Sequence, residues 1–329
     1  PSDSEHTPFT ENMNLGFKKA QDLRYGENPH QRAAFYKDEA AVGLSLAGAK
    51  QVHGKELSFN NLMDLDAALK LVAEFDEPAA CIIKHATPCG VACSNAAGKN
   101  LKDAFLDALE CDKLSAFGGI IGLNKVVDEE TALAIADAGF IECIISPAYD
   151  KKAFDILSKK KNLRLMETGD IKKLNSGAAL DFKKITGGAL FQDCDTEDID
   201  KKDIKVVTKK QPTAAEIDSL YFAWKVVKHV RSNAIVLCQG KKTVGIGAGQ
   251  TSRVESVIIA IRKAGDRAND STLASDAFFP KADSIEAAAN SGVRSIIQPG
   301  GSIADQEIID AANKFGISMV FTGIRHFKH

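Results

Sequence analysis

The sequence predicts an α/β protein built from two tandem units, and three observations support that fold class. Short apolar runs typical of buried strands alternate with segments that carry apolar residues at helical spacing. This alternation occurs twice, with paired features at a nearly constant separation along the chain. A length of 329 residues, with 44% hydrophobic and 26% charged residues, gives room for two units of ordinary globular composition. We therefore expect an internal duplication, with mostly parallel or mixed sheets flanked by helices.

Apolar spacing and turn residues predict the elements of the first unit. Residues 64–75 repeat apolar side chains at helical spacing and are predicted as a helix. Residues 80–83 are predicted as a short buried strand, which a Thr-Pro-Cys-Gly turn at 87–90 ends. Further along, residues 140–147 are expected to form a strand, followed by a helix and then by a strand at 162–166.

The second unit repeats this order of elements. Its expected elements, in chain order, are a helix at 216–230, a strand at 234–238, a hairpin partner or neighbouring strand at 241–246, a glycine turn at 247–249, a strand at 293–299, a helix at 307–315 and a strand at 317–321. We assign residues 1–200 to an N-terminal segment plus the first unit, and residues 201–329 to the second unit. Residues 1–30 are expected to be a long polar loop, and residues 168–211 a solvated connection.

Charge and composition exclude several classes of partner. The 42 basic and 44 acidic residues give a net charge of -2, so no field of one sign points to a nucleic-acid partner. No apolar run approaches the roughly 20 residues that span a bilayer, and the polar residues 1–8 do not resemble a signal peptide. We expect a cytoplasmic protein without membrane contact, whose seven cysteines are reduced thiols.

The stretch from Cys81 to Cys93 holds three cysteines and a histidine, which raises the question of a metal site. Zinc sites usually offer paired cysteines at matching spacing. Here Cys89 and Cys93 are too far apart for a Cys-x-x-Cys pair, no second pair follows, and the His-x-Glu of zinc deaminases is absent. We expect no catalytic metal, and interpret these cysteines as small buried apolar residues.

Lys84 and His85 follow the predicted strand at 80–83, where α/β proteins place ligand-binding groups. A histidine there is a satisfied structural residue about as often as a catalytic one, so a second sign is needed. The matching position of the second unit supplies it, because Asn233 precedes a predicted strand and a glycine-rich run ending in Arg253 follows it. Backbone N–H groups beside an arginine suit an anionic or carbonyl-bearing ligand.

Eight motifs together resemble one known family over almost the whole chain. They are RYGENPHQ (24–31), KHATPCG (84–90), SAFGG (115–119), KHVRSNAIV (228–236), GIGAGQTSR (245–253), SDAFFP (275–280), QPGGSIAD (298–305) and RHFKH (325–329). The family is the aminoimidazolecarboxamide ribonucleotide (AICAR) transformylase domain of the bifunctional purine-biosynthesis protein. The resemblance implies two tandem units similar to cytidine deaminase, without its zinc. The family's inosine monophosphate (IMP) cyclohydrolase domain has no counterpart in this sequence.

The resemblance implies transfer of a formyl group from 10-formyltetrahydrofolate, the co-substrate, to the 5-amino group of AICAR in IMP biosynthesis. That amine is a poor nucleophile, because the imidazole and its carboxamide delocalise the nitrogen lone pair. By resemblance, His85 is the general base, Lys84 stabilises charge on the formyl oxygen, and Asn233 orients His85 and the carboxamide.

The resemblance also assigns two sets of binding residues. The AICAR set consists of Arg24, Tyr25, His85, Gly118, Glu142, Asn233, Arg253 and Arg325. The folate set consists of Val254, Phe278, Asp283, Ser302 and Ile303. The family further implies a homodimer, and allows a structural potassium ion.

Two other functions are kept as alternatives. The first is a non-catalytic module that binds AICAR or a related nucleotide, for which the phosphate-binding arginines and a stacking surface would suffice. The second is a metal-dependent, deaminase-like hydrolase, which would require stoichiometric metal. The binding module differs from the transferase at Lys84 and His85, which it would not need, whereas the hydrolase differs by its metal.

Overall fold

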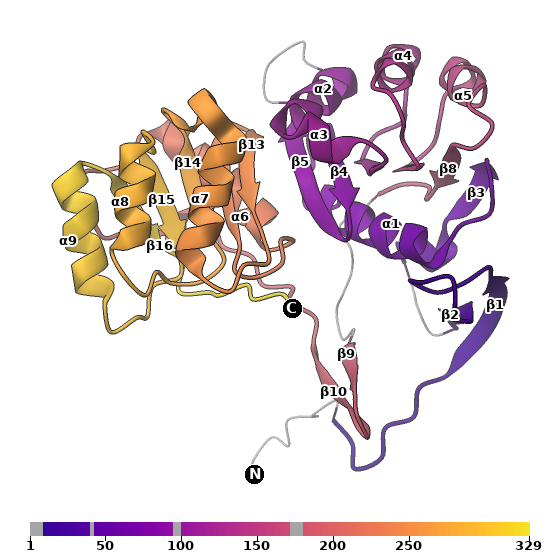
Figure 1. Ribbon diagram of the computed structural model, residues 1–329, viewed down its shortest axis with the longest axis horizontal. Helices are drawn as coiled ribbons and strands as arrows, with labels where there is room; N and C mark the ends of the chain where they lie inside the picture. The colour runs from indigo at the N-terminus through magenta and orange to yellow at the C-terminus, as the bar shows by residue number, and fades with distance from the viewer. Residues whose placement is uncertain (1–8, 40–42, 95–99, 172–179) are drawn as a thin grey trace.

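The computed structural model describes residues 9–39, 43–94, 100–171 and 180–329. Its main body is a twelve-stranded mixed sheet flanked by helices, from which two separate two-stranded hairpins project (Figure 1). The predicted α/β class and the large mixed sheet are therefore confirmed. The polar residues 1–8, on which the expectation of a cytoplasmic protein partly rests, lie outside the described residues.

The twelve strands follow the same order outward from the centre in each half of the sheet. In spatial order they are β11 (Lys205–Val206), β16 (Ser318–Phe321), β15 (Ser295–Gln298), β14 (Thr272–Ser275), β12 (Ile235–Gln239), β13 (Lys242–Gly247), β5 (Thr87–Cys93), β4 (Ala79–Lys84), β6 (Ile120–Leu123), β7 (Cys143–Ser146), β8 (Arg164–Glu167) and β3 (Lys50–His53). The hairpins β4–β5 and β12–β13 are antiparallel, and β6–β7–β8 and β14–β15–β16 are parallel.

The two halves of the sheet meet where β5 runs antiparallel to β13. Ala92 pairs with Lys242, and the backbone N–H of Cys93 donates to the carbonyl of Lys241 at 2.9 Å. The hydroxyl of Thr243 also accepts from the N–H of Val91 at 2.9 Å and donates to its carbonyl at 3.1 Å. A side chain therefore completes the backbone pairing at a junction that is otherwise short.

Helices cover both faces of the sheet. On one face, α1 (Phe59–Val72) and α6 (Ala214–Val227) share a single apolar core. On the other face, α2 (Leu101–Cys111), α4 (Glu129–Asp137) and α5 (Lys151–Leu157) cover the first half, and α7 (Arg253–Ala264), α8 (Asp283–Asn290) and α9 (Asp305–Phe315) cover the second. In the part of the chain that the structure describes, the remaining helical elements are the short α3 (Lys113–Ala116) and the 3-10 turns η1 (Leu46–Gly48), η2 (Lys201–Asp203) and η3 (Gly265–Ala268).

Strands β4 and β12 are buried on both faces, which explains their continuous apolar sequences. Along β4, Cys81 and Ile83 face the core shared by α1 and α6, whereas Ile82 faces α2. This alternation follows from the two-residue period of a strand. The predicted strands at 80–83 and 234–238 correspond to β4 and β12.

The predicted turn at 87–90 is wrong, because Thr87–Cys93 forms β5. The hairpin instead turns at His85 and Ala86, whose φ angles are 53° and 55°, as a two-residue type I′ turn requires. Pro88 sits beside a shift in the β4–β5 register, where a strand tolerates a residue without an N–H. Gly90 is needed for packing, since a Cβ there would lie 1.9 Å from the carbonyl oxygen of Ala108 in α2.

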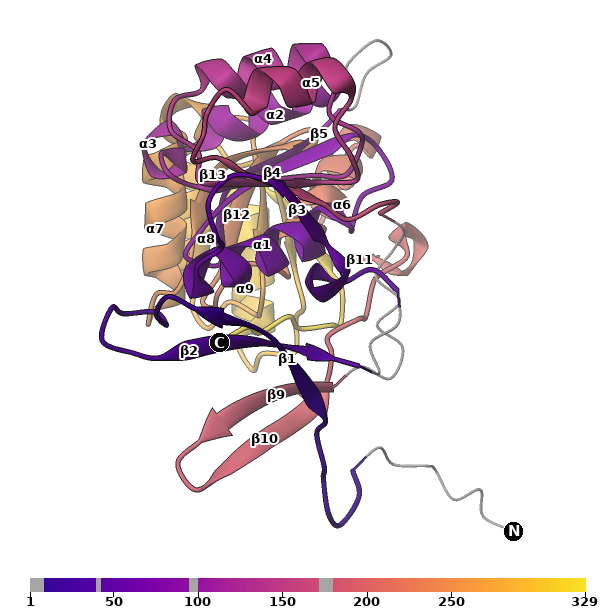
Figure 2. The same cartoon turned by 90° about the vertical axis from the view of Figure 1, so that its right-hand side faces the viewer.

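Two hairpins lie in segments that we expected to be loops. The expected polar loop at 1–30 contains β1 (Phe17–Leu23), which pairs with β2 (Ala33–Asp38). The expected connection at 168–211 contains β9 (Leu180–Ile185) paired with β10 (Gly188–Asp193). Both hairpins extend away from the main sheet (Figure 2), and most of their side chains are exposed or only half-buried, so no apolar alternation marks them as strands.

Candidate active site

His85 occupies the tip of the β4–β5 hairpin, and helix α1 holds this tip. Helix α1 begins after Ser58, whose hydroxyl accepts from the N–H of Asn61 while the Asn61 side chain accepts from the N–H of Ser58. This capping box places Asp64 in the second turn of α1. The Asp64 carboxylate accepts from the N–H of His85 at 3.2 Å and from the N–H of Ala86 at 2.6 Å.

The tip of this hairpin borders a cleft of about 300 Å³. The residues that line the cleft are Glu27, Asn60, Met63, Asp64, His85, Ala86 and Arg231. Glu27 belongs to the RYGENPHQ motif and Arg231 to the KHVRSNAIV motif, so segments far apart in the sequence converge beside His85. Arg231, which follows α6, is the contribution of the second half of the chain.

Lys84 is the last residue of β4, and its ammonium group donates to the carbonyl of Phe117 at 2.7 Å. The next residue, Gly118, has a φ of 71° and donates its N–H to the carbonyl of Phe140 at 2.8 Å. The ring centres of Phe117 and Phe140 lie 5.6 Å apart, and the two residues are 62% and 46% exposed. Lys84 and Gly118 are therefore brought together beside an accessible aromatic pair.

Glu142 lies in the same half, but its carboxylate already has a partner. Arg164 donates to Glu142 Oε2 at 2.5 Å and also to the carbonyl of Glu56 at 3.1 Å. Arg164 belongs to neither of the two predicted binding sets. Its position at the start of β8, beside the parallel strand β7, could have suggested a group at this edge of the sheet.

In the second half, Asn233 and Arg253 lie in one hydrogen-bond network. Arg253 Nη2 donates to Asn233 Oδ1 at 2.7 Å, and Asn233 Nδ2 donates to the carbonyl of Gln250 at 2.9 Å. Arg253 Nη1 donates to Ser275 Oγ at 2.8 Å and forms an ion pair with the buried Asp276. Asp276, which lies in the SDAFFP motif but in neither predicted binding set, is central to the network.

The glycine-rich run is used mainly for packing. Gly245 and Gly247 lie within β13, where a Cβ would fall 2.1 Å from the carbonyl oxygen of Ala260 and 1.9 Å from that of Ser256. The expected turn at 247–249 is confirmed only after the strand ends, with Gly249 at a φ of 68°. Its N–H donates to the carbonyl of Arg231 at 2.8 Å, so this N–H group is not free to bind an anion.

The five folate-assigned residues lie at one end of the second half. Val254 is in the first turn of α7, and Asp283 begins α8. Phe278 is 37% exposed, whereas its neighbour Phe279 is fully buried. Ser302 and the exposed Ile303 lie in the loop before α9. Among the described residues, no hydrogen bond or ion pair joins this group to Lys84 or His85.

Two arginines assigned to AICAR are exposed. Arg24 lies 5.7 Å from the centre of the Tyr25 ring, and Arg325 lies 4.5 Å from the centre of the Phe327 ring. The C-terminal segment that carries Arg325 is packed against the second half. The N–H of His326 donates to the carbonyl of Asp276 at 3.0 Å.

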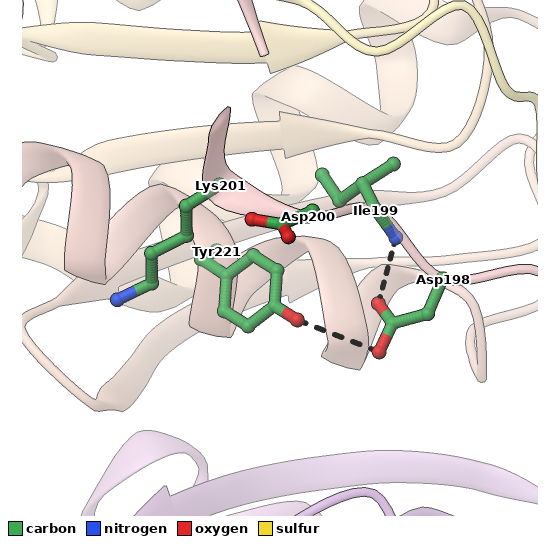
Figure 3. Close-up of a pocket in the computed structure, with 5 residues that line it drawn as sticks. All are labelled: Asp198, Ile199, Asp200, Lys201 and Tyr221. Atoms are coloured by element: carbon green, nitrogen blue, oxygen red, sulfur yellow. Dashed lines mark hydrogen bonds between the residues drawn. The ribbon is translucent and has the colours of Figure 1, made fainter. Parts of the chain in front are cut away.

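A second cavity, of about 460 Å³, lies between η2 and α6 and contains none of the assigned residues (Figure 3). In it the Tyr221 hydroxyl donates to Asp198 Oδ2 at 3.4 Å, and the N–H of Ile199 donates to Asp198 Oδ1 at 2.9 Å. Lys201 and Lys225 lie 5.4 Å and 5.1 Å from the Tyr221 ring centre. We place the candidate site at His85 because this cavity lacks the motif residues.

Cys81, Cys89 and Cys93 are buried, as predicted from the sequence. Burial raises the pKa of Cys89 to about 12, so its thiol is protonated at neutral pH. Across the described ranges, no group of three or more His, Cys, Asp or Glu side chains is arranged to hold a metal ion. Within the same ranges, no helix is both long and apolar enough to cross a membrane.

Comparison with known proteins identifies the family. Residues 2–263 match the model of the AICARFT/IMPCHase bienzyme family, and the chain belongs to that family. The bifunctional purine biosynthesis protein PurH of Acetivibrio thermocellus is 51% identical over 98% of this chain, and that of Halalkalibacterium halodurans is 53% identical over 97%. The chain spans 62% and 61% of these relatives' lengths.

Proposed function

We propose that this chain carries the formyl-transfer activity of its family, moving the formyl group of 10-formyltetrahydrofolate to the 5-amino group of AICAR. One observation carries the proposal. His85 is held by Asp64 at a hairpin tip that faces a cleft, in a chain about half identical to bifunctional purine biosynthesis proteins.

The proposed mechanism assigns one task to each of three side chains. The AICAR amine attacks the formyl carbon while His85 takes up a proton from the amine nitrogen. The Lys84 ammonium, which lies beside the exposed Phe117, stabilises the charge that develops on the formyl oxygen. The bond from the formyl carbon to the folate nitrogen N10 then breaks, and N10 gains a proton. Asn233 orients the carboxamide of AICAR.

Exposure supports the assignment of some residues of the two binding sets. The exposed guanidiniums of Arg24 and Arg325 suit the phosphate of AICAR. The Arg253 side chain is buried, so its place in the AICAR set rests on its hydrogen bond to Asn233 and not on exposure. For the folate, Phe278 offers an aromatic surface and Asp283 a carboxylate.

A homodimer is part of this proposal. Isolated two-stranded hairpins are only marginally stable, yet β1–β2 and β9–β10 project from the body (Figure 2). They carry exposed apolar side chains, among them Phe17, Tyr36, Phe182 and Leu190. A second copy of the chain would cover these hairpins. It would also bring the folate-assigned group of one subunit next to His85 of the other.

We further propose that the chain is a duplicated, cytidine deaminase-like pair of units with a boundary near residue 200. The shared strand order supports this proposal, since each half has an antiparallel hairpin followed by three parallel strands. The corresponding hairpin strands β5 and β13 also both pack glycines against a helix carbonyl.

A spectrophotometric assay for tetrahydrofolate formation from AICAR and 10-formyltetrahydrofolate tests the proposed function. We expect turnover by the purified chain without added metal. AICAR binding in calorimetry without turnover would favour the non-catalytic binding module. Ammonia release together with stoichiometric metal in the purified protein would favour the deaminase-like hydrolase.

A further inference from the structure

Asp64 makes an unusual contact with the tip of the β4–β5 hairpin. Each of its carboxylate oxygens accepts one backbone N–H, Oδ2 from His85 at 3.2 Å and Oδ1 from Ala86 at 2.6 Å. These two residues are the central residues of the turn, and both have positive φ angles. The carboxylate therefore holds, through hydrogen bonds, the two peptide units that determine where the His85 side chain lies.

The sequence of the turn explains why it needs hydrogen bonds from outside the hairpin. A type I′ turn favours Asn-Gly, since both central residues must adopt the left-handed conformation. His85-Ala86 lacks a glycine, and the Cβ of Ala86 disfavours this conformation. Hydrogen bonds to an ionised carboxylate are stronger than those between neutral groups. Asp64 thus supplies the stabilisation that the turn residues themselves do not.

Helix α1, which carries Asp64, is itself fixed at its far end. Glu74, just after α1, accepts from Lys228 at 2.7 Å and from His229 at 2.9 Å, and all three side chains are largely buried. Lys228 and His229 follow α6 of the second half. Helix α1 therefore connects the turn to the second half of the chain as well as to the first. Arg231 of the second half lines the same cleft.

We infer that Asp64 is a positioning residue for formyl transfer, holding the strained turn so that the His85 imidazole faces the cleft. The catalytic effect that we infer rests on the proposed function. The positioning of the turn rests on the two hydrogen bonds from the backbone to Asp64. Asp64 acts through the backbone of His85 and Ala86, and takes no part in the chemistry.

Kinetics of three variants test the inference. Asp64→Ala is expected to lower kcat by about 10²-fold, the scale of a small misplacement of a reacting group, while the KM for AICAR changes by less than about threefold. Adding Ala86→Gly is expected to raise kcat at least about tenfold over that of Asp64→Ala, because glycine adopts positive φ without strain. Asp66→Ala is the matched control, since it removes an exposed carboxylate that pairs with Lys70 on the same helix.

Hydrogen exchange provides a readout that does not depend on activity. The amides of His85 and Ala86 are expected to be protected in the wild type and to exchange faster in Asp64→Ala, with the melting temperature showing that the variant is folded. Unchanged kcat in Asp64→Ala, or a loss that Ala86→Gly does not rescue, would overturn the inference. Absence of formyl transfer by the wild-type chain would instead overturn the proposed function. Unchanged amide exchange of His85 and Ala86 in Asp64→Ala would overturn the claim that Asp64 holds the turn.

Discussion

The guanidinium of Arg253 and the carboxylate of Asp276 form an ion pair with side chains only 5% and 0% exposed. Ser232 also donates to Asp276, and Arg253 in turn donates to Asn233 Oδ1. Asn233 is thereby held with its amide nitrogen toward the carbonyls of Gln250 and Thr251. The orientation of a residue assigned to the substrate thus depends on a buried pair behind it.

Asp276→Asn is expected to destabilise the chain by about 3–5 kcal/mol, because removing one partner leaves the Arg253 guanidinium buried without a counter-charge. Urea unfolding at neutral pH measures this loss. Asp270→Asn is the matched control, since Asp270 pairs with Arg294 at 2.7 Å but both side chains are more than half exposed. The control should change stability by at most about 1 kcal/mol. Similar losses in the two variants would contradict the assigned role of Asp276.

The buried cluster at the end of α1 gives the stability a pH dependence. Burial alone would raise the pKa of Glu74, but the hydrogen bond from His229 and the nearby Lys228 outweigh it and lower this pKa to about 2. Burial lowers the pKa of His229 to about 4, against the opposing hydrogen bond to Glu74. At neutral pH, a neutral His229 therefore donates to an ionised Glu74.

His229→Gln is expected to flatten the loss of stability between pH 6.5 and pH 4. The pKa of His229 is about 4 in the folded chain and near its ordinary value of 6.5 in the unfolded chain, so the unfolded state binds the proton first as the pH falls. The free energy of unfolding then drops by up to about 1.4 kcal/mol per pH unit in this window. Urea titrations at several pH values compare the two proteins. An equally steep slope in the variant would show that His229 is not the cause.

Gly90→Ala tests the corrected position of the hairpin turn. The new Cβ would meet the Ala108 carbonyl of α2 at 1.9 Å, and overpacking against a helix backbone costs at least about 1–3 kcal/mol. Gly188→Ala, in the exposed strand β10, serves as the control because its nearest neighbour would be 3.8 Å away. Thermal unfolding of both variants measures the difference. Equal melting temperatures would contradict the close approach of α2 to β5.

Apolar periodicity was sufficient for several of the buried helices and strands, but the buried strands β6 and β14 were not predicted. The helix expected at 216–230 is α6 at Ala214–Val227, and the strand expected at 317–321 is β16 at Ser318–Phe321. Exposed strands such as β1 and β9 carry no such pattern, so they could not be predicted. Strand β5 was missed for another reason, because Pro88 and Gly90 indicate a turn unless the neighbouring register shift and helix are known.

Only part of the candidate site could be predicted from the sequence. Lys84 and His85 could be proposed as candidates because they lie at the end of a buried strand and just after it. Asp64 could not, because it contacts the turn from a helix 21 and 22 residues away, and no periodic pattern records that contact. Asp276 was hidden in the same way, since its pairing with Arg253 spans 23 residues and becomes visible only when β14 lies beside the start of α7.

The turnover of His85→Asn measured against the wild-type chain tests the central claim most directly. Asparagine also adopts positive φ readily, so the hairpin tip is kept while the imidazole is removed. We expect AICAR binding within about tenfold of the wild type, and formyl transfer lower by at least about 10²-fold, as for the loss of a general base. Formyl transfer at the wild-type rate in His85→Asn would contradict the account.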